Sequence, residues 1–560
     1  MTSIGDQPRR IVIVGAGHGG GTVAALLRQQ RFAGEIVVVG AEPVGPYHRP
    51  PLSKSLLRGD LEQPLQPRDF YREQQIELRT GTRVETLDRM ARRAHLSDGG
   101  SIDYDVAILA TGAKARRLEI PGRDLEKVYE LRTIAHARVL HDVLTPGRHL
   151  AVVGGGWIGL EVAASALAAG VQVTVIEREE RLLARVASPE LSRHLSECHT
   201  GEGTRILTSA RVSGLESGPR GQVVAVTLED GETIPCDRVL IGVGAVADDE
   251  LARAAGLRCE DGVVVDDCGR TEDPYVYAVG DVTRRPVPLH EGLLRVESIP
   301  SAVEQARQAV AAILGAVAPA PEVPWFWSDQ FDLKLQIAGL LRDTDRATVR
   351  ADPALGKFVV FHTRGGRLIA VEGVNAAAEF MAGKRLIRDQ PELDLDRLAD
   401  GAVALDAVAL PAPAFVGANG APAPPIAAAE PATAANGDAP GDAVAFPGPG
   451  GTPGEPRATF IQPDGSVTSV DIPAGLSLMD GSIRNNLPGI LAECGGMCSC
   501  GTCHVFVEPG WQERLPEPEY EEDELLEFLE GRQPNSRLSC QIVMDDGLDG
   551  IVVRVAGTAG

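Results

Sequence analysis

The chain has 560 residues, of which 44% are hydrophobic and 4% aromatic, and its formal net charge is −24 at pH 7. This length exceeds what one hydrophobic core supports and predicts several domains. The acidic balance argues against nucleic acid or an anionic membrane surface as the main partner, because both require clustered Lys and Arg. The sequence shows no long uncharged apolar run and no signal-peptide core before Arg10, so we expect a cytoplasmic protein without membrane insertion.

Two segments of the chain share one pattern, in which an apolar strand is followed by a Gly-rich turn and a helix. The first begins at Arg9 (RRIVIVGAGHGGG) and the second at His149 (HLAVVGGGWIGLEV). Such a turn lets the backbone approach a pyrophosphate, which the N-terminus of the following helix attracts. The repeat therefore predicts two dinucleotide-binding units of Rossmann-like α/β fold. Their motif residues are Gly15, Gly17 and Gly20 in the first unit, and Gly154, Gly156 and Gly159 in the second.

The strand that follows the second motif, VQVTVI, ends next to Glu177. A carboxylate at this place accepts hydrogen bonds from the adenine-ribose hydroxyls of NAD and repels the 2′-phosphate of NADP. The sequence therefore favours NADH over NADPH, although the adjacent Arg178 is of a residue type that binds a phosphate.

The rest of the chain changes character twice. A helical stretch from Arg295 to about Ala316 and alternating strand-like runs to about Arg388 predict a small α+β domain. From about Gly401 to Pro456 the composition becomes rich in Ala, Pro and Gly, which predicts a mobile linker because such a segment buries little apolar surface. Strand periodicity then returns in the last hundred or so residues (ATFIQPDG, SVTSVDIPAG, IVVRVAG), which predict a separate small domain.

Five of the nine Cys lie in this last domain, which indicates a local metal site. Short thiolate spacings in LAECGGMCSCGTCHVFV suit a loop wrapped around a soft metal centre. Cys494, Cys500 and Cys503 form a C-x5-C-x2-C pattern, and Cys540 provides a distant fourth thiol. Cys498 is an alternative to Cys500 as a ligand. A zinc site is the other alternative, although such sites usually show paired C-x2-C knuckles and this loop offers one.

Residues from about 8 to 390 resemble the putidaredoxin-reductase and biphenyl-dioxygenase ferredoxin-reductase type of FAD enzyme. The resemblance depends on six segments: PYHRPPLSK, LATGAKARRL, ELRT, YAVGDV, RVESIPSAVEQA and PWFWSDQ. It implies that the flavin is contacted by residues spread along the chain. These are Gly15, Gly17, Gly19, Gly20, Arg49, Lys54, Val84, Thr111, Arg132, Asp281, Ile299 and Trp327, the last two lining the isoalloxazine.

One of these residues has a physical reason of its own, and two further cofactor contacts are expected. Asp281 follows a Val-Gly pair at a strand end, where a carboxylate accepts hydrogen bonds from ribityl hydroxyls. In the family, an acidic residue follows the Gly that ends the second strand. This position is Ala41 here, so either Glu42 reaches the FAD ribose or no residue does. Gly244 is expected to contact a cofactor in the second unit.

Lys54 and Glu161 resemble the family's charged pair near flavin N5, where Lys stabilises the reduced anionic flavin and Glu orients Lys or the nicotinamide. The alternative interpretation is a surface Lys and a helix-stabilising Glu. Hydride transfer is the chemistry of the cofactors, and the protein stacks the two rings and excludes water. Because no Cys precedes Cys198, disulfide-reductase and peroxidase functions lack the Cys that they need beside the flavin.

The last domain resembles the adrenodoxin and putidaredoxin ferredoxins in its Cys spacing and in CGTCHV, SRLSCQI and LDGIVVRV. The resemblance implies a ubiquitin-like (β-grasp) α+β fold and a [2Fe-2S] cluster on Cys494, Cys500, Cys503 and Cys540. In these ferredoxins the helix that corresponds to EPEYEEDELLEFLEG is where reductase and acceptor dock. A merely solvated acidic helix is the alternative.

The predicted organisation has five parts. Residues 1–118 and 247–320 form a discontinuous FAD-binding domain, 119–246 the NAD-binding domain, 321–395 a reductase C-terminal domain, 396–456 the linker and 457–560 the ferredoxin. The predicted function is NADH-dependent ferredoxin reduction, with electrons passing from FAD to a [2Fe-2S] cluster docked in cis and then to a cytochrome P450 or a Rieske oxygenase. The alternatives are an NADH oxidase or quinone reductase with an accessory ferredoxin, and a redox sensor without catalysis.

Overall fold

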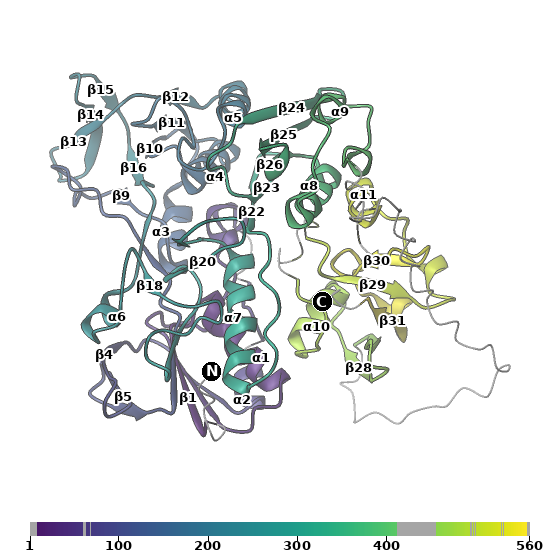
Figure 1. Ribbon diagram of the computed structural model, residues 1–560. Coiled ribbons are helices and arrows are strands. Elements are labelled where there is room, and N and C mark those ends of the chain that lie inside the picture. Colours follow the sequence, from purple (N-terminus) through teal and green to yellow (C-terminus); the bar gives the residue numbers. More distant parts are fainter. Residues whose placement is uncertain are drawn as a thin grey trace, which may run out of the picture.

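Four folded units follow one another along the chain in the computed structural model of Figure 1, from purple at the N-terminus to yellow at the C-terminus. The structure describes residues 8–59, 63–67, 69–410, 455–492, 496, 498, 500–527, 529 and 531–556. Among them, no helix combines the length and the apolar character that a membrane span requires.

The first unit is a parallel sheet with helices on its faces. Its strands are buried because helices cover them, as in other parallel sheets. Helices α1 (His18–Gln29) and α7 (Ile299–Leu314) pack against each other, although they lie far apart in the sequence. The strands run in the order β19 (Val276–Ala278), β7 (Val106–Leu109), β1 (Arg10–Val14), β2 (Glu35–Val39) and β3 (Ile76–Arg79).

The second unit repeats this architecture and is inserted into the first. The chain crosses between them on two strands, β8 (Ala113–Ala115) and β17 (Ala245–Ala247), which pair with each other. Its helices are α3 (Ile134–Val143), α4 (Trp157–Ala168) and α5 (Pro189–Gly201). Its parallel strands run in the order β12 (Arg205–Leu207), β11 (Gln172–Ile176), β10 (His149–Val153), β16 (Arg238–Ile241) and β9 (Val128–Tyr129).

Three small sheets and two short helices complete these two units. The helices are α2 (Phe70–Glu73) and α6 (Glu250–Ala254). The sheets are β4 (Val84–Asp88), β5 (Arg93–Leu96) and β6 (Ser101–Asp103); β13 (Val212–Ser217), β14 (Val223–Leu228) and β15 (Thr233–Pro235); and β18 (Val263–Val264), β20 (Thr283–Pro286) and β21 (Leu293–Leu294).

The third unit is an antiparallel sheet covered by α8 (Ala377–Asp389), and α9 (Leu395–Ala399) follows that helix. Side chains alternate between the two faces of each strand, so β22 directs one set toward the second unit and the other toward α8. Its strands run in the order β22 (Trp325–Gln330), β23 (Leu333–Gly339), β26 (Arg367–Val374), β25 (Lys357–Arg364) and β24 (Arg346–Asp352).

This unit extends further than the sequence predicted. Residues 396–410, expected to belong to the linker, are folded: Leu398 and Val408 are fully buried, and Arg350 donates to the carbonyl oxygens of Leu398 and Val403 at 2.7 and 2.9 Å. The Ala-rich composition concealed a spaced set of apolar side chains that pack on the sheet. The remaining linker residues, 411–454, lie outside the described part of the chain.

The fourth unit has a mixed sheet in which the first and last strands, β27 and β31, pair in parallel at the centre. Helix α10 (Leu478–Arg484) begins at a capping box formed by Ser477 and Asp480, and α11 (Tyr520–Glu527) packs on α8 of the third unit. The predicted fold class, two Rossmann-like units, a small α+β unit and an α+β ferredoxin-like unit, is confirmed. The strand order is β28 (Val467–Asp471), β27 (Arg457–Ile461), β31 (Ile551–Val555), β29 (His504–Val507) and β30 (Ser536–Leu538).

Candidate functional site

The first Gly-rich turn packs too closely for side chains at two of its glycines and leaves room at a third. Gly15 has a φ of +115°, and a Cβ there would lie 2.2 Å from the carbonyl oxygen of Ala110. A Cβ at Gly20 would lie 2.0 Å from the carbonyl oxygen of Gly15. At Gly17 the nearest atom to such a Cβ is Nη2 of Arg49, 3.9 Å away. The open backbone therefore lies at the start of α1, where a dinucleotide phosphate fits.

Four of the predicted FAD residues form a chain of polar contacts beside this turn. Arg49 lies 2.8 Å from the Glu42 carboxylate and donates to the carbonyl oxygen of Arg132 at 2.6 Å. Arg132 in turn lies 3.2 Å from Asp281. The structure thus brings together residues from three separate segments of the chain. The Glu42 carboxylate, expected at the ribose, is engaged by Arg49 and by the hydroxyl of Tyr47 at 2.7 Å.

The other predicted FAD residues lie on separate elements. Gly19 is in the first turn of α1, where a Cβ would meet Val279 at 3.3 Å. Thr111 donates to the carbonyl oxygen of Asp248 at 2.7 Å, next to the crossing between the two units. Val84 begins β4 and packs against the buried core of the first unit. Ile299 is the first residue of α7 and Trp327 is half-buried on β22.

The predicted charged pair is brought together in a buried place. Nζ of Lys54 lies 2.7 Å from Oε2 of Glu161, with side-chain exposures of 12% and 4%. The Ser53 hydroxyl also donates to Oε2, and the Ser328 hydroxyl donates to Oε1 at 2.6 Å. A buried carboxylate needs such partners, because an unpaired charge in the interior is costly. Lys54 and Glu161 therefore do not form the surface arrangement that the alternative interpretation required.

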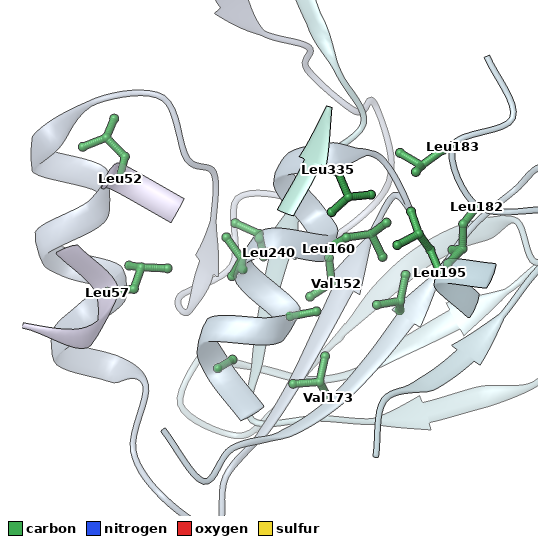
Figure 2. Close-up of a cluster of buried hydrophobic side chains, with 14 of the residues drawn as sticks. Leu52, Leu57, Val152, Leu160, Val173, Leu182, Leu183, Leu195, Leu240 and Leu335 are labelled. Carbon is green, nitrogen blue, oxygen red and sulfur yellow. The ribbon is translucent and has the colours of Figure 1, made fainter. Parts of the chain in front are cut away.

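A shared apolar cluster holds this pair in place. Leu52 and Leu57 flank Lys54 in the sequence, and Leu160 precedes Glu161; all three belong to one buried cluster, as Figure 2 shows. Leu335 on β23, which pairs with Ser328, lies in the same cluster. The first three units thus meet around the pair, and its geometry is set by packing contributed by each of them.

The hydroxyl partners of Glu161 were not predicted from the sequence. Ser53 and Ser328 both lie inside segments that carry the family resemblance, PYHRPPLSK and PWFWSDQ. No spacing rule connects them with Glu161, since they lie more than a hundred residues from it in opposite directions along the chain. Asp329, next to Ser328, was also missed; burial raises its pKa, and the nearby Lys54 ammonium opposes this.

The second Gly-rich turn repeats the geometry of the first. Gly154 has a φ of +109°, and a Cβ there would lie 2.4 Å from the carbonyl oxygen of Gly242, whereas nothing lies within 4 Å of a Cβ at Gly156. Glu177 accepts hydrogen bonds from the backbone N–H of Gly155 at 2.7 Å and of Glu179 at 2.9 Å. These bonds place its carboxylate beside the turn, as the sequence predicted.

The remaining predicted residues of the second turn are also placed. A Cβ at Gly159 would lie 2.3 Å from the carbonyl oxygen of Gly154, which is the same close packing as in the first turn. Gly244 has a φ of +99° and faces Nη2 of Arg185. Arg178, the candidate for a phosphate contact, is largely exposed and lies 2.9 Å from Glu179.

A further observation indicates that both turns fit a dinucleotide. The first residue of α1 is His18 and that of α4 is Trp157. Nδ1 of His18 and Nε1 of Trp157 are buried and, among the described residues, lack a hydrogen-bond partner. Buried polar atoms normally have partners, so two such atoms beside two open glycines indicate places where a bound group completes the structure.

The predicted cluster ligands are partly assembled. Sγ of Cys503 lies 3.4 Å from Sγ of Cys540, and the hydrogen bond between them lowers the pKa of the Cys540 thiol. Cys500 and Cys498 are buried in the same loop. Cys500 interacts electrostatically with the Cys540 thiol, and the backbone of Cys498 forms a hydrogen bond with it. Cys494 lies outside the described residues. Cys503 and Cys540 thus form a close pair of thiols, one with a lowered pKa, as a soft metal centre that binds thiolates requires of its ligands.

The cluster loop is in contact with the third unit. Cys500 belongs to the buried core of that unit, together with Trp325 and Phe380, and Met381 of α8 packs against the ferredoxin-like core. Trp325 lies 5.6 Å from Trp327 between ring centroids. The sulfur-rich loop and the half-buried Trp327 therefore lie on the same side of the reductase units.

Three parts of the chain match known families. Residues 9–309 match the pyridine nucleotide-disulphide oxidoreductase family, residues 325–409 the reductase C-terminal family, and residues 461–545 the 2Fe-2S iron-sulfur cluster binding domain. The probable ferredoxin reductase CtmF of Castellaniella defragrans is 45% identical over 405 residues, which are 72% of this chain and 99% of that protein. Putidaredoxin reductase CamA of Pseudomonas putida is 39% identical over 402 residues, 70% of this chain and 95% of that protein.

Solved structures show the same similarity. The covalent putidaredoxin reductase–putidaredoxin complex contains a chain with a TM-score of 0.70 and 38% identity, covering 72% of this chain and 98% of that chain. The ferredoxin reductase for the CYP199A2 system of Rhodopseudomonas palustris gives a TM-score of 0.69 and 38% identity, covering 72% and 100%.

Proposed function

The chain belongs to the pyridine nucleotide-disulphide oxidoreductase family, and on this premise we propose that it carries electrons from NADH, by way of FAD and its own [2Fe-2S] cluster, to a cytochrome P450 or a Rieske oxygenase. The resemblance to FAD-dependent ferredoxin reductases and to [2Fe-2S] ferredoxins is confirmed. The chain is an FAD-dependent oxidoreductase of the ferredoxin–NAD(+) reductase type, and FAD, NAD(H) and a [2Fe-2S] cluster are its cofactors.

In this proposal the first unit binds FAD and the second unit binds NADH. When bound, FAD supplies the step between two-electron and one-electron transfer. Gly17 offers open backbone to its phosphates, and Arg49, Arg132 and Asp281 provide charged groups along the same side. Gly156 and Glu177 do the same for NADH, and the Glu177 carboxylate disfavours a 2′-phosphate.

Lys54 is the residue on which the electrostatics of hydride transfer depend in this proposal. Its ammonium is almost buried and is held by Glu161. Such a charge is worth more in a dry site than in water, and it favours a flavin that has gained negative charge. Glu161 holds the ammonium in position rather than exchanging a proton with the substrate.

The observation that carries the proposal is the contact between Cys500 and the core of the third unit. Cys500, a predicted cluster ligand, belongs to the same buried cluster as Trp325 of β22, the strand that also contains Trp327 and Ser328. The acidic helix α11 lies against α8, and Ala377 and Met381 of α8 pack against the ferredoxin-like core. These contacts support docking of the ferredoxin unit in cis.

The names of two relatives support the proposed acceptor class. One solved relative is the reductase for the CYP199A2 system, and another relative is the ferredoxin–NAD(+) reductase subunit of the benzene 1,2-dioxygenase system of Pseudomonas putida, 38% identical over 393 residues. The acidic surface of the ferredoxin unit suits a basic partner protein.

The test is an anaerobic NADH titration of the purified chain followed by electron paramagnetic resonance. We expect flavin bleaching and then the signal of a reduced [2Fe-2S] cluster. In Cys500→Ser, NADH-dependent cytochrome c reduction should be lost while ferricyanide reduction continues; Cys498→Ser should keep both, because Cys498 is the surplus thiol. Cys268→Ser, at a thiol that is not among the predicted cofactor or cluster residues, is the control. Cytochrome c reduction at the normal rate in Cys500→Ser would overturn the proposed route.

A further inference from the structure

A line of buried polar side chains connects Glu161 with helix α5. Oε1 of Glu161 accepts from the Ser328 hydroxyl at 2.6 Å, and Oγ of Ser328 accepts from the Gln330 amide at 3.1 Å. Oε1 of Gln330 lies 2.8 Å from Nε2 of His199. Ser328 and Gln330 are 1% exposed and His199 is 0% exposed. The line crosses from the second unit to edge strand β22 and back again.

The Glu161 carboxylate at one end of this line fixes the direction of the hydrogen bonds that connect it with His199. A carboxylate only accepts, so Ser328 must donate to Glu161 and accept from the NH₂ of Gln330. The Gln330 oxygen then accepts from Nε2–H of His199 at 2.8 Å. Burial lowers the pKa of His199 and so favours the neutral imidazole, in which Nδ1 accepts from the Thr204 hydroxyl at 3.4 Å.

The two oxygens of Glu161 are held by different groups. Oε2 receives Lys54 and Ser53, while Oε1 receives Ser328. Contacts on one oxygen leave a carboxylate free to turn about its terminal torsion, which is broad for Glu. A donor on the second oxygen stops that rotation. Ser328 therefore determines which way the oxygen that binds Lys54 points.

We propose that Ser328, Gln330 and His199 are positioning residues, which fix the rotation of the Glu161 carboxylate and thereby hold the Lys54 ammonium in place for the flavin. This inference rests on the proposed function, because it concerns the same charged pair. The proposal gives His199 a role in the redox step, because three hydrogen bonds connect it with Glu161. It also gives a role to α5, a helix of the second unit that carries none of the predicted cofactor residues.

Helix α5 is a firm anchor for the far end of the line. At its N-terminus the backbone N–H of Ser188 donates to Glu372 at 2.9 Å, and Glu372 lies 2.9 Å from His362 in a buried pair. In its middle His194 stacks on Phe358, with ring centroids 4.4 Å apart. Leu195 of α5 belongs to the apolar cluster drawn in Figure 2. The third unit therefore fixes α5 over its length.

Two variants break the line away from Glu161. Gln330→Met keeps a similar volume and removes both hydrogen bonds, and His199→Leu removes the last one. His199→Gln keeps an N–H for Gln330 and is the conservative variant. His194→Asn is the matched control, since it removes a contact between the same helix and the third unit without touching the line.

The readouts are the flavin midpoint potential, the anaerobic rate of flavin reduction at saturating NADH, and the NADH dissociation constant, all on FAD-loaded protein. We expect Gln330→Met and His199→Leu to lower the reduction rate about tenfold. The equilibrium between oxidised and reduced flavin should shift about tenfold, which is about 30 mV more negative for a two-electron couple. NADH binding should stay within twofold, and His199→Gln and His194→Asn should resemble the wild type.

Each outcome bears on the inference. A Gln330→Met protein with normal potential and rate would overturn it, and so would His199→Gln that is as impaired as His199→Leu. Should Gln330→Met not load FAD, the pair His199→Leu and His199→Gln decides the matter by the same measurements. Wild-type chain that NADH does not reduce would instead refute the proposed function, so the two failures are distinguishable.

Discussion

The substitution Gly156→Ala in the second Gly-rich turn should weaken cofactor binding without changing folding stability. Gly156 is the N-cap residue of α4, with φ −86° and ψ 178°, a conformation open to any residue. A methyl group there meets no atom within 4 Å. It does, however, occupy the space in front of the helix N-terminus, where we expect the NADH pyrophosphate to approach the backbone.

The expected change in folding stability is close to zero because two terms offset. Ala in place of an N-cap Gly costs some fraction of about 1 kcal/mol. Replacing Gly by Ala where the backbone permits it restricts the unfolded chain and stabilises by about 0.4–1 kcal/mol. By contrast, Gly154→Ala places a Cβ 2.4 Å from the carbonyl oxygen of Gly242 at a φ of +109°, so it should destabilise the second unit by at least about 1–3 kcal/mol.

NADH binding by Gly156→Ala, unlike its folding stability, should be clearly weakened. A methyl group that keeps the pyrophosphate from one backbone N–H removes a hydrogen bond to a charged group, worth about 1.5–3 kcal/mol. This corresponds to an NADH dissociation constant raised about 10- to 100-fold. Flavin content should not change, because the first turn is untouched.

The assay has three parts: FAD absorbance per chain, thermal or urea unfolding, and NADH affinity from anaerobic titration of flavin reduction. Gly154→Ala serves as the control that loses stability, and Gly17→Ala as the counterpart at the first turn, where FAD retention should suffer instead. Unchanged NADH affinity in Gly156→Ala, with unchanged stability, would refute the view that this open backbone is the pyrophosphate site.

Three further predictions concern Glu177, His199 and the segment 411–454. In Glu177→Gln the loss of negative charge should lower the ratio of kcat/KM for NADH to that for NADPH at least severalfold; a ratio equal to that of the wild type would argue that Glu177 does not read the ribose. Burial lowers the pKa of His199 in the folded chain. Below about pH 6.5, the ordinary pKa of His, the unfolded chain therefore takes up a proton that the folded chain does not. The free energy of unfolding should decrease as the pH decreases, by at most about 1.4 kcal/mol per pH unit for this group. Urea unfolding of His199→Gln between pH 7 and 5 should show a smaller slope than the wild type. Shortening the segment 411–454 should slow cytochrome c reduction but not flavin reduction by NADH, and equal rates would contradict a tethering role.

The sequence predicted those parts of the site that depend on local backbone. Each Gly-rich turn is a single strand-turn-helix unit, and the close approaches of Gly20 to the Gly15 carbonyl and of Gly159 to the Gly154 carbonyl are what such a turn requires. Glu177 was predicted for the same reason, because it ends the next strand. These features need only a few tens of residues, within which the chain's own pattern determines the geometry.

The charged pair is a different case. Lys54 and Glu161 lie 2.7 Å apart, but no periodicity connects a loop residue of the first unit with a helix residue of the second. Resemblance to a family suggested the pair, and packing of three units creates it. The hydroxyls of Ser53 and Ser328 were beyond sequence reasoning, because Ser is common and its role depends on a tertiary contact. The linker boundary failed for a related reason, since residues 396–410 are ordered by the sheet on which they pack.

The position of the ferredoxin unit limits how the proposed electron route operates. Cys500 is 7% exposed where the cluster loop meets the third unit, so a protein acceptor has no access to that side of the loop in this arrangement. Beyond the apolar contacts of α8, the first unit adds a hydrogen bond from Gln29 to Asn486 at 2.9 Å. Contacts of this kind are suited to a domain that docks and leaves. Under the proposed function, intake and delivery of electrons therefore require two positions of one domain, and the tether keeps the first position accessible after each departure.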